Sequence, residues 1–204
     1  MTTRTNNPEL SQAKILESAQ TLFIERGFDG TSMSAIAKDS GVTQSMIHHY
    51  FGSKDELWQA VKKDAYDEYL AHQQQLLDLD NDDIEAFIEN SLRSRFTFFM
   101  ENPRTARLLS WLQIMEDPTG METGQEIGRQ LLAKIQQAQA DGQIRDDMEP
   151  ESVLSMSIAL TTHWFQSRHY IENLTGISPE DRETSDAAYL DAIIKVFVEG
   201  LKPL

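Results

Sequence analysis

Apolar residues recur at intervals of three and four positions through most of this 204-residue chain, which is the spacing of amphipathic helices. No alternation of apolar and polar residues extends beyond four positions, so no β-strand is expected. Proline, glycine and capping residues divide the pattern into segments. We therefore predict an all-α fold of nine helices, at about 10–26, 33–40, 44–50, 54–79, 82–101, 103–115, 121–140, 150–173 and 181–200.

The second and third of these helices are short and are separated by a tight turn. Ser32 suits the N-cap of the first, and Gly41 suits the left-handed conformation that commonly ends a helix. Thr43 is a second N-cap, directly after Val42, which we expect to be buried in the turn. Two short helices joined in this way form a helix-turn-helix, whose second helix enters the major groove of DNA.

The second of these helices has two chemically different sides. Its apolar residues fall on one side, namely Met46, Ile47 and Tyr50. Its hydrogen-bonding residues fall on the other, namely Gln44, Ser45 and His48. Glutamine pairs with adenine through two hydrogen bonds, and serine or histidine reaches acceptors on purines. Candidate phosphate contacts are Thr43, Tyr50, Lys54 and the backbone N–H groups near Ser32. The alternative is a helical hairpin whose polar side faces only water.

Four short motifs at fixed spacing include this hairpin and its flanks. They are A-x-x-L-F-x-x-x-G-F at 19–28, T-S-M-x-x-I-A at 31–37, G-V-T at 41–43 and Y-F-G-S-K-x-E-L at 50–57. Together, the residues from Leu10 to Val61 closely resemble the DNA-binding domain of TetR-type transcriptional regulators.

This resemblance implies an all-helical homodimer that binds a palindromic operator and is released by a small ligand. It implies a three-helix DNA-binding domain over residues 10–54 and a six-helix ligand-binding and dimerisation domain over residues 55–204. It also implies a repressor, although the residues themselves fit a repressor and an activator alike. Carried over to this chain, the groove-facing residues are Thr43, Gln44, Ser45 and His48. The residues that grip the DNA backbone are Thr31, Ser32, Tyr50 and Lys54.

The net charge of −15 is unusual for a DNA-binding protein, but its distribution is more informative than its size. Residues 1–54 contain five basic and five acidic side chains, whereas residues 55–204 contain 13 basic and 28 acidic ones. The excess negative charge therefore lies outside the predicted DNA-binding domain. Repulsion between that charge and the phosphates would favour a single docking orientation.

Composition and motifs argue against several other classes of protein. The chain has no cysteine, so it forms neither a disulfide nor a thiolate metal site. Without a long apolar run or a hydrophobic signal segment, we expect a cytoplasmic protein with no membrane partner. The usual catalytic, nucleotide-binding and metal-binding motifs are missing, so we expect no enzyme, cofactor or metal. Two other functions stay open: DNA binding without an effector, and an acidic helical module that binds a protein.

The last predicted helix has an apolar face that is wider than a single chain needs to bury. Its members are Tyr189, Leu190, Ile193, Ile194, Phe197, Val198 and Leu201. The long helix before it is also apolar over a broad arc, which includes Leu154, Ile158 and Phe165. We predict that these last two helices pair with their two-fold mates in a homodimer. The alternative is burial within one chain.

Two arginines fall inside apolar helix faces. On a helical wheel Arg95 lies between Ile84 and Ile88, and Arg168 lies close to Trp164. A lone buried charge is costly, so each arginine needs an anionic partner. We predict an apolar effector with an anionic group, bound by Arg95, Phe99, Trp111, Met115, Trp164 and Arg168. The alternative is that both arginines pair with carboxylates of neighbouring helices.

Overall fold

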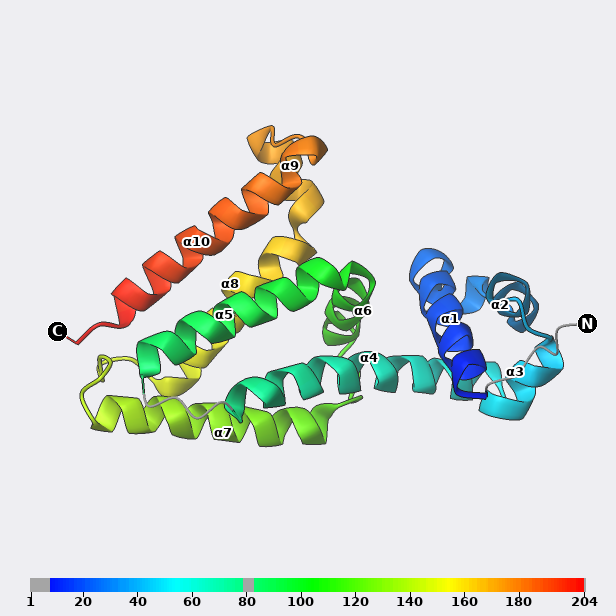
Figure 1. Ribbon diagram of the computed structural model, residues 1–204, viewed down its shortest axis with the longest axis horizontal. Helices are drawn as coiled ribbons and strands as arrows, with labels where there is room; N and C mark the ends of the chain where they lie inside the picture. Colours follow the sequence, from blue (N-terminus) through cyan, green and yellow to red (C-terminus); the bar gives the residue numbers. More distant parts are fainter. Residues whose placement is uncertain (1–7, 79–82, 204) are drawn as a thin grey trace, which may run out of the picture.

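The computed structural model describes residues 8–78 and 83–203, and within these ranges every regular element is a helix. Helices α1 to α3 form a small head at one end of the molecule, and α4 runs from this head into a larger body (Figure 1). The elements are α1 (Pro8–Gly30), α2 (Met33–Ser40), α3 (Gln44–Phe51), α4 (Lys54–Leu77), α5 (Ile84–Glu101), α6 (Pro103–Ile114), α7 (Met121–Ala140), α8 (Pro150–Gln166), α9 (Arg168–Thr175), the 3-10 helix η1 (Pro179–Asp181) and α10 (Arg182–Leu201). No described helix is both long and apolar enough to cross a membrane.

The all-α prediction is confirmed, but the predicted helix over 150–173 is in fact two helices that meet at Ser167. The Ser167 backbone leaves helical geometry at φ −104° and ψ 8°. Its N–H still donates to the His163 carbonyl, and its carbonyl still accepts from Ile171, both at 2.9 Å. The break therefore loses little hydrogen bonding and involves neither proline nor glycine, so periodicity could not reveal it. The expected six helices after the head are seven α-helices, α4 to α10, in the described residues.

The first helix changes direction at Gly27, where the helix was predicted to end. Gly27 has φ 73° and ψ 171°, a backbone conformation that residues with a side chain rarely adopt. The change of direction brings the Phe28 ring back onto Phe23, with ring centroids 5.8 Å apart. Phe23 also packs edge-on against Trp58 of α4, at 4.9 Å. These rings pack together at the end of the head where α4 leaves it.

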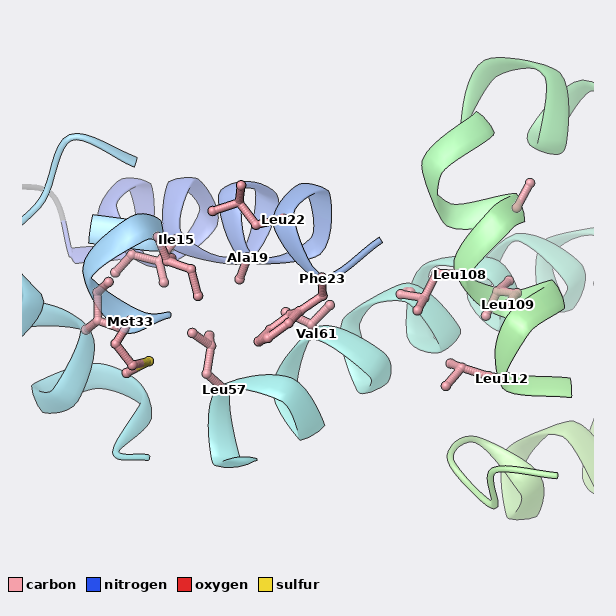
Figure 2. Packing of buried hydrophobic residues seen from close by; sticks show 14 of the residues in the cluster. Ile15, Ala19, Leu22, Phe23, Met33, Leu57, Val61, Leu108, Leu109 and Leu112 are labelled. Atoms are coloured by element: carbon pink, nitrogen blue, oxygen red, sulfur yellow. The ribbon is translucent and has the colours of Figure 1, made fainter. Parts of the chain in front are cut away.

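One continuous apolar core joins the head to the body along α4. Figure 2 labels buried side chains of this core from α1, α2, α4 and α6, and α3 and α5 contribute further members. They include Ile15, Ala19, Leu22, Phe23, Met33, Leu57, Val61, Leu108, Leu109 and Leu112. Because these side chains share one core, a movement of α6 must disturb α4 and α1. The predicted domain boundary, between residues 54 and 55, falls at the first residues of α4.

A second core fills the space between α5, α7, α8 and α10. Most of the apolar face predicted for dimerisation lies in this core or beside it: Ile193, Ile194, Phe197 and Leu201 are buried, and Tyr189, Leu190 and Val198 are half-buried. On α8, Leu154, Ile158 and Phe165 are also half-buried. The assignment of Ile193, Ile194, Phe197 and Leu201 to a dimer interface is therefore wrong, because they are buried within one chain, whereas that of Tyr189, Leu190 and Val198 stays a prediction. The wide face exists because α10 packs against both α5 and α8 within the same chain.

An ion pair ties α4 to the loop between α6 and α7. Lys62 is buried, and its Nζ lies 2.6 Å from an Asp117 carboxylate oxygen. Asp117 also accepts a hydrogen bond from the Thr119 N–H at 3.0 Å, which shapes the loop. Burial of the Asp117 carboxyl raises its pKa, but the hydrogen bonds from Lys62 and Thr119 outweigh burial and hold the pKa below its ordinary value.

We expect Asp117→Asn to lower the free energy of unfolding by about 1–3 kcal/mol near neutral pH, because it leaves the buried Lys62 charge unpaired. The pKa of Asp117 is lower in the folded than in the unfolded protein. Its stabilisation is therefore complete above the unfolded pKa of about 4 and is lost as the pH falls through the folded pKa. Urea titrations at several pH values should show the two proteins converging only in acid.

The matched control is Asp67→Asn, on α4, the helix that carries Lys62. Asp67 pairs with Lys63, and both side chains are largely exposed. Its replacement should cost at most about 0.5 kcal/mol, since exposed pairs contribute little. Equal losses in the two variants would show that the Lys62–Asp117 pair has no special role.

Candidate functional site

The helix-turn-helix is built by the caps that the sequence predicted. The Ser32 hydroxyl accepts from the Ala35 N–H at 3.1 Å, and the Thr43 hydroxyl accepts from the Met46 N–H at 3.3 Å. Gly41 ends α2 with φ 70°, and its N–H donates to the Ala37 carbonyl. These bonds satisfy backbone groups at the helix ends and set the angle between α2 and α3.

The outward side of α3 carries the predicted groove-facing residues. Gln44, Ser45 and His48 are exposed, whereas Ile47 is fully buried. Met46 and Tyr50 are half-buried on the inner side, so the predicted division of this helix is confirmed. His49 is exposed as well and widens the polar surface beyond the predicted residues. The helical spacing could have identified His49, because on a helical wheel it lies beside Ser45 on the polar side of the helix.

Gln44 and His48 form a pair whose hydrogen-bonding roles follow from their surroundings. His48 Nδ1 lies 2.7 Å from the Gly52 carbonyl oxygen, which can only accept, so Nδ1 carries a proton. In neutral histidine Nε2 is then an acceptor, and Gln44 Nε2 lies 3.4 Å from it. This contact turns the amide nitrogen of Gln44 toward His48 and leaves its oxygen free. The outward face of α3 therefore presents oriented donors and acceptors.

Thr31 does not belong to this surface. It is 2% exposed, and its hydroxyl lies 2.9 Å from both the Leu22 and the Gly27 carbonyl oxygens. Its backbone N–H donates to the Phe28 carbonyl at 3.2 Å. Both donors are therefore occupied inside the head, where Thr31 caps the end of α1. The assignment of Thr31 to the DNA backbone is wrong, because the change of direction at Gly27 places it beneath the surface.

The other three predicted backbone contacts remain near the surface. Ser32 is exposed at the start of α2, and Tyr50 and Lys54 are half-buried. Lys54 is the first residue of α4, and its Nζ lies 4.2 Å from the centre of the Phe28 ring. A capping box holds this end of α4: the Ser53 N–H donates to the Glu56 carboxylate, and the Glu56 N–H donates to Ser53 Oγ. The head thus presents a hydroxyl, a phenol and an ammonium group around α3.

The predicted effector residues are dispersed over the body. A cleft of about 1070 Å³ lies between α6, α9 and α10 and is lined by Phe99, Trp111 and Arg168. Trp111 is 46% exposed there. Arg95 lines a separate cavity, Trp164 is buried, and Met115 is 60% exposed outside the cleft. The prediction that all six residues line one site is therefore wrong, because they lie on different sides of α5 and α8.

The charge of Arg168 is already neutralised within the chain. Its Nη2 donates to both carboxylate oxygens of Asp186, at 2.7 and 2.9 Å. The same buried carboxylate accepts from the Trp164 indole N–H at 2.7 Å. Asp186 was missed by the sequence analysis, although it precedes Leu190, Ile193 and Phe197 on the apolar face of α10. A charge in an apolar face was the signal that could have found it.

Arg95 behaves differently. It is 2% exposed, and among the described residues no carboxylate lies within ion-pair distance of it. Its terminal nitrogens donate to the Ser157 carbonyl at 3.2 Å and to Gln73 Oε1 at 3.3 Å. The two arginines that looked alike in the sequence are thus in opposite states: Arg168 is paired and Arg95 is not.

Two family models match this chain. Residues 15–61 match bacterial regulatory proteins of the tetR family, and residues 92–194 match the tetracyclin repressor-like C-terminal domain. Among curated proteins, the transcriptional regulator RutR of Escherichia coli K12 is 26% identical over 197 residues, which cover 93% of this chain and 89% of RutR. The repressor KstR2 of Mycolicibacterium smegmatis is 25% identical over 172 residues, which cover 81% of this chain and 82% of KstR2.

Solved structures show the same fold. KstR2 of Mycobacterium tuberculosis superposes with a TM-score of 0.74 at 15% identity, covering 98% of each chain. PfmR of Thermus thermophilus gives 0.67 at 18% identity, covering 93% of this chain and 96% of PfmR. One family model matches the head, and the other covers half of the chain by itself. The chain therefore belongs to the TetR family, and it is a DNA-binding transcriptional regulator rather than an enzyme.

Proposed function

We propose that this regulator is a homodimeric, ligand-responsive repressor, and that it acts in the cytoplasm on a palindromic operator. The observation that carries the proposal is the exposed face of α3, where Gln44, Ser45 and His48 lie on a helix capped at both ends and remote from the body. A two-fold dimer would place two such helices in successive major grooves, which requires a palindromic site. Ser32, Tyr50 and Lys54 would hold the neighbouring phosphates.

The dimer would form through the outer faces of α8 and α10. On α10 the exposed residues Ala188, Ala192 and Val196 follow one another at intervals of four, and Val196 is 71% exposed. On α8 the exposed residues Met156 and Ala159 give a comparable face. Small side chains let helices approach closely, and the two faces of two chains would form a four-helix interface.

The effector would act on the contact between head and body. Trp111 of α6 lines the cleft, and its ring lies 5.9 Å from Trp58 of α4. Arg107 and Trp111 also line a smaller cavity beside Phe28 at the base of the head. A small apolar molecule with an anionic group, bound in the body, would shift α6 and so change the spacing of the two heads. An altered spacing no longer matches two half-sites, and the operator is released.

The experiment that tests the proposal starts with the DNA fragments that the protein retains from its own genome. We expect a shared palindromic sequence, bound by a dimer with an affinity that falls as the salt concentration rises. Retention of fragments without a shared sequence would instead indicate a general DNA-binding protein. If the protein retains no DNA, a protein-binding module is favoured and the proposal is overturned.

Replacement of Gln44 by Ala should reduce discrimination at particular base pairs by about 1–3 kcal/mol for each base recognised, because the oriented amide is removed. Binding titrations on the operator and on single-base variants would measure this change. Gln59→Ala is the matched control, since Gln59 is exposed on α4 away from the α3 face. Unchanged base preference in Gln44→Ala would show that α3 does not read the operator through this face.

Replacement of Lys54 by Ala should weaken binding to all DNA sequences by a similar factor. The slope of log affinity against log salt should fall by about one for each phosphate that Lys54 neutralises in the wild type. Lys63→Ala serves as the control, because Lys63 is exposed on the same helix but lies farther from the head. An equal effect of the two variants would exclude a direct phosphate contact by Lys54.

Ala192→Arg should convert the dimer to a monomer and abolish tight operator binding, because a charged side chain cannot be buried in the paired faces. Ala133→Arg makes the same chemical change at an exposed position of α7, outside the proposed interface, and should leave the dimer intact. Light scattering at micromolar concentration measures both masses. A monomeric wild type, or a dimer that tolerates Ala192→Arg, would argue against this interface.

A further inference from the structure

Arg95 is the one described arginine that combines nearly complete burial with no acidic partner. Both of its hydrogen-bond acceptors, the Ser157 carbonyl and the Gln73 amide oxygen, are neutral. A guanidinium stays charged inside a protein, so Arg95 cannot avoid the cost of burial by losing its proton. An uncompensated internal cation of this kind is costly for the fold alone and suits an anion that arrives separately.

Unsatisfied polar atoms cluster around the same guanidinium. Arg95 Nε is buried and has no hydrogen-bond partner, and the same is true of Gln73 Nε2 and Ser91 Oγ. Ser91 and Arg95 are four residues apart on α5, so they project from the same face of the helix. Buried polar atoms normally have partners, and three orphans on adjoining side chains point to a missing acceptor. A carboxylate offers two oxygens, enough to accept from the guanidinium and from a neighbouring donor.

A small cavity adjoins these groups. It has a volume of about 30 Å³ and touches Ser91, Arg95 and Ser157. Its remaining walls are apolar and come from four helices, with Phe87, Ile88, Leu131, Ile135, Val153, Leu154 and Phe197. The space holds no more than about two water molecules. A ligand tail could therefore enter only if these apolar walls, which carry no charge, move apart.

We propose that Arg95 binds the carboxylate of an apolar monocarboxylic acid, and that the acid's tail opens the apolar cavity between α5, α7, α8 and α10. This assignment rests on the proposed ligand-responsive function and specifies the chemistry of its effector. Ser91 lies beside the guanidinium as a second donor to the carboxylate, and Gln73 supplies an amide N–H from α4. The wall residues Leu131, Ile135 and Phe197 contact the tail.

The open cleft near α6 is the weaker place for this carboxylate. The arginines that line it include Arg168 and Arg182, which are already paired with Asp186 and Glu172. An anion at Arg168 or Arg182 would have to displace an internal carboxylate, whereas at Arg95 it displaces none. Arg107 also lines the cleft, but it is exposed, so water screens its charge. The apolar surroundings of Arg95 also strengthen an ion pair, because water screens it less.

The test uses the full-length protein with octanoate and 4-phenylbutyrate as probes, and octanamide as the uncharged counterpart. Both acids should raise the Tm of the wild type, whereas octanamide should not. Arg95→Met should abolish this response, lowering the affinity for octanoate at least 10-fold. Without ligand the variant should be as stable as the wild type or a few degrees more stable, because an unsatisfied charge is removed. A merely structural arginine would give the opposite change in Tm.

Arg93→Met is the matched control. Arg93 lies on the same helix, is exposed, and pairs with Glu89, so its loss should leave the response to octanoate unchanged. If Arg95→Met does not fold, Arg95→Gln replaces it, and the same loss of response is expected. A response to octanoate that survives in either Arg95 variant overturns the assignment.

His72 provides a readout in the wild type that needs no variant. Burial lowers the pKa of His72, and the charge of Arg95 lowers it further, while Glu101 and Glu68 act in the opposite direction. A carboxylate bound to Arg95 would cancel that charge, so octanoate should raise the pKa of His72 in an NMR titration. Octanamide should leave it unchanged. No movement of this pKa at saturating octanoate would contradict binding at Arg95.

Three further outcomes are informative, and the last two separate this inference from the proposed function. If sodium chloride alone gives the full Arg95-dependent rise in Tm and octanoate adds nothing, the site takes an inorganic anion and the effector assignment fails. If the protein binds its operator but no carboxylate changes its Tm, the inference fails while the regulator remains. If it binds no operator but octanoate stabilises it through Arg95, the carboxylate site stands and the proposed function fails.

Discussion

The shared apolar core along α4 is the constraint on which the rest of the molecule depends. Leu57 and Val61 bury their side chains against α1, and the same cluster continues to Leu108 and Leu112 of α6. Burial of apolar surface is the main source of stability, so the head cannot separate from the body without exposing this core. A single rigid helix therefore fixes the position of α3, and any change at α6 is transmitted to the head through packed side chains.

Most of the buried polar groups described above connect separate helices or loops. Thr31 closes the end of α1, and Lys62 with Asp117 fastens the loop after α6 to α4. Asp186 collects donors from Trp164 and Arg168 and so connects α8, α9 and α10. In each of these cases the partners meet inside the chain and the polar group is satisfied. Arg95 departs from this rule, because its Nε has no partner, and the proposed carboxylate ligand would supply one.

The acidic body and the neutral head have complementary roles in DNA binding. The outward face of α3 has hydrogen-bonding groups and no acidic residue, so nothing on it repels phosphates. With few cations near the groove, affinity in the proposed dimer would depend on a good fit of α3 and on two heads acting together more than on charge. Such a dimer would be sensitive to the spacing of its heads, so a modest displacement of α6 would be enough to weaken DNA binding.

Local sequence determined the helices, their caps and the two sides of α3, because each depends on residues within a few positions of one another: Ser32 with Ala35, Gly41 with Ala37, Thr43 with Met46. It also showed that Arg95 and Arg168 lie in apolar faces. Only the tertiary structure decided that Thr31 is buried, that the centre of the apolar face of α10 is buried within the chain, and that the long helix divides at Ser167. The two arginines give the reason. Whether a buried charge finds a partner depends on which distant helix packs beside it: α10 brings Asp186 to Arg168, while no described helix brings a carboxylate to Arg95.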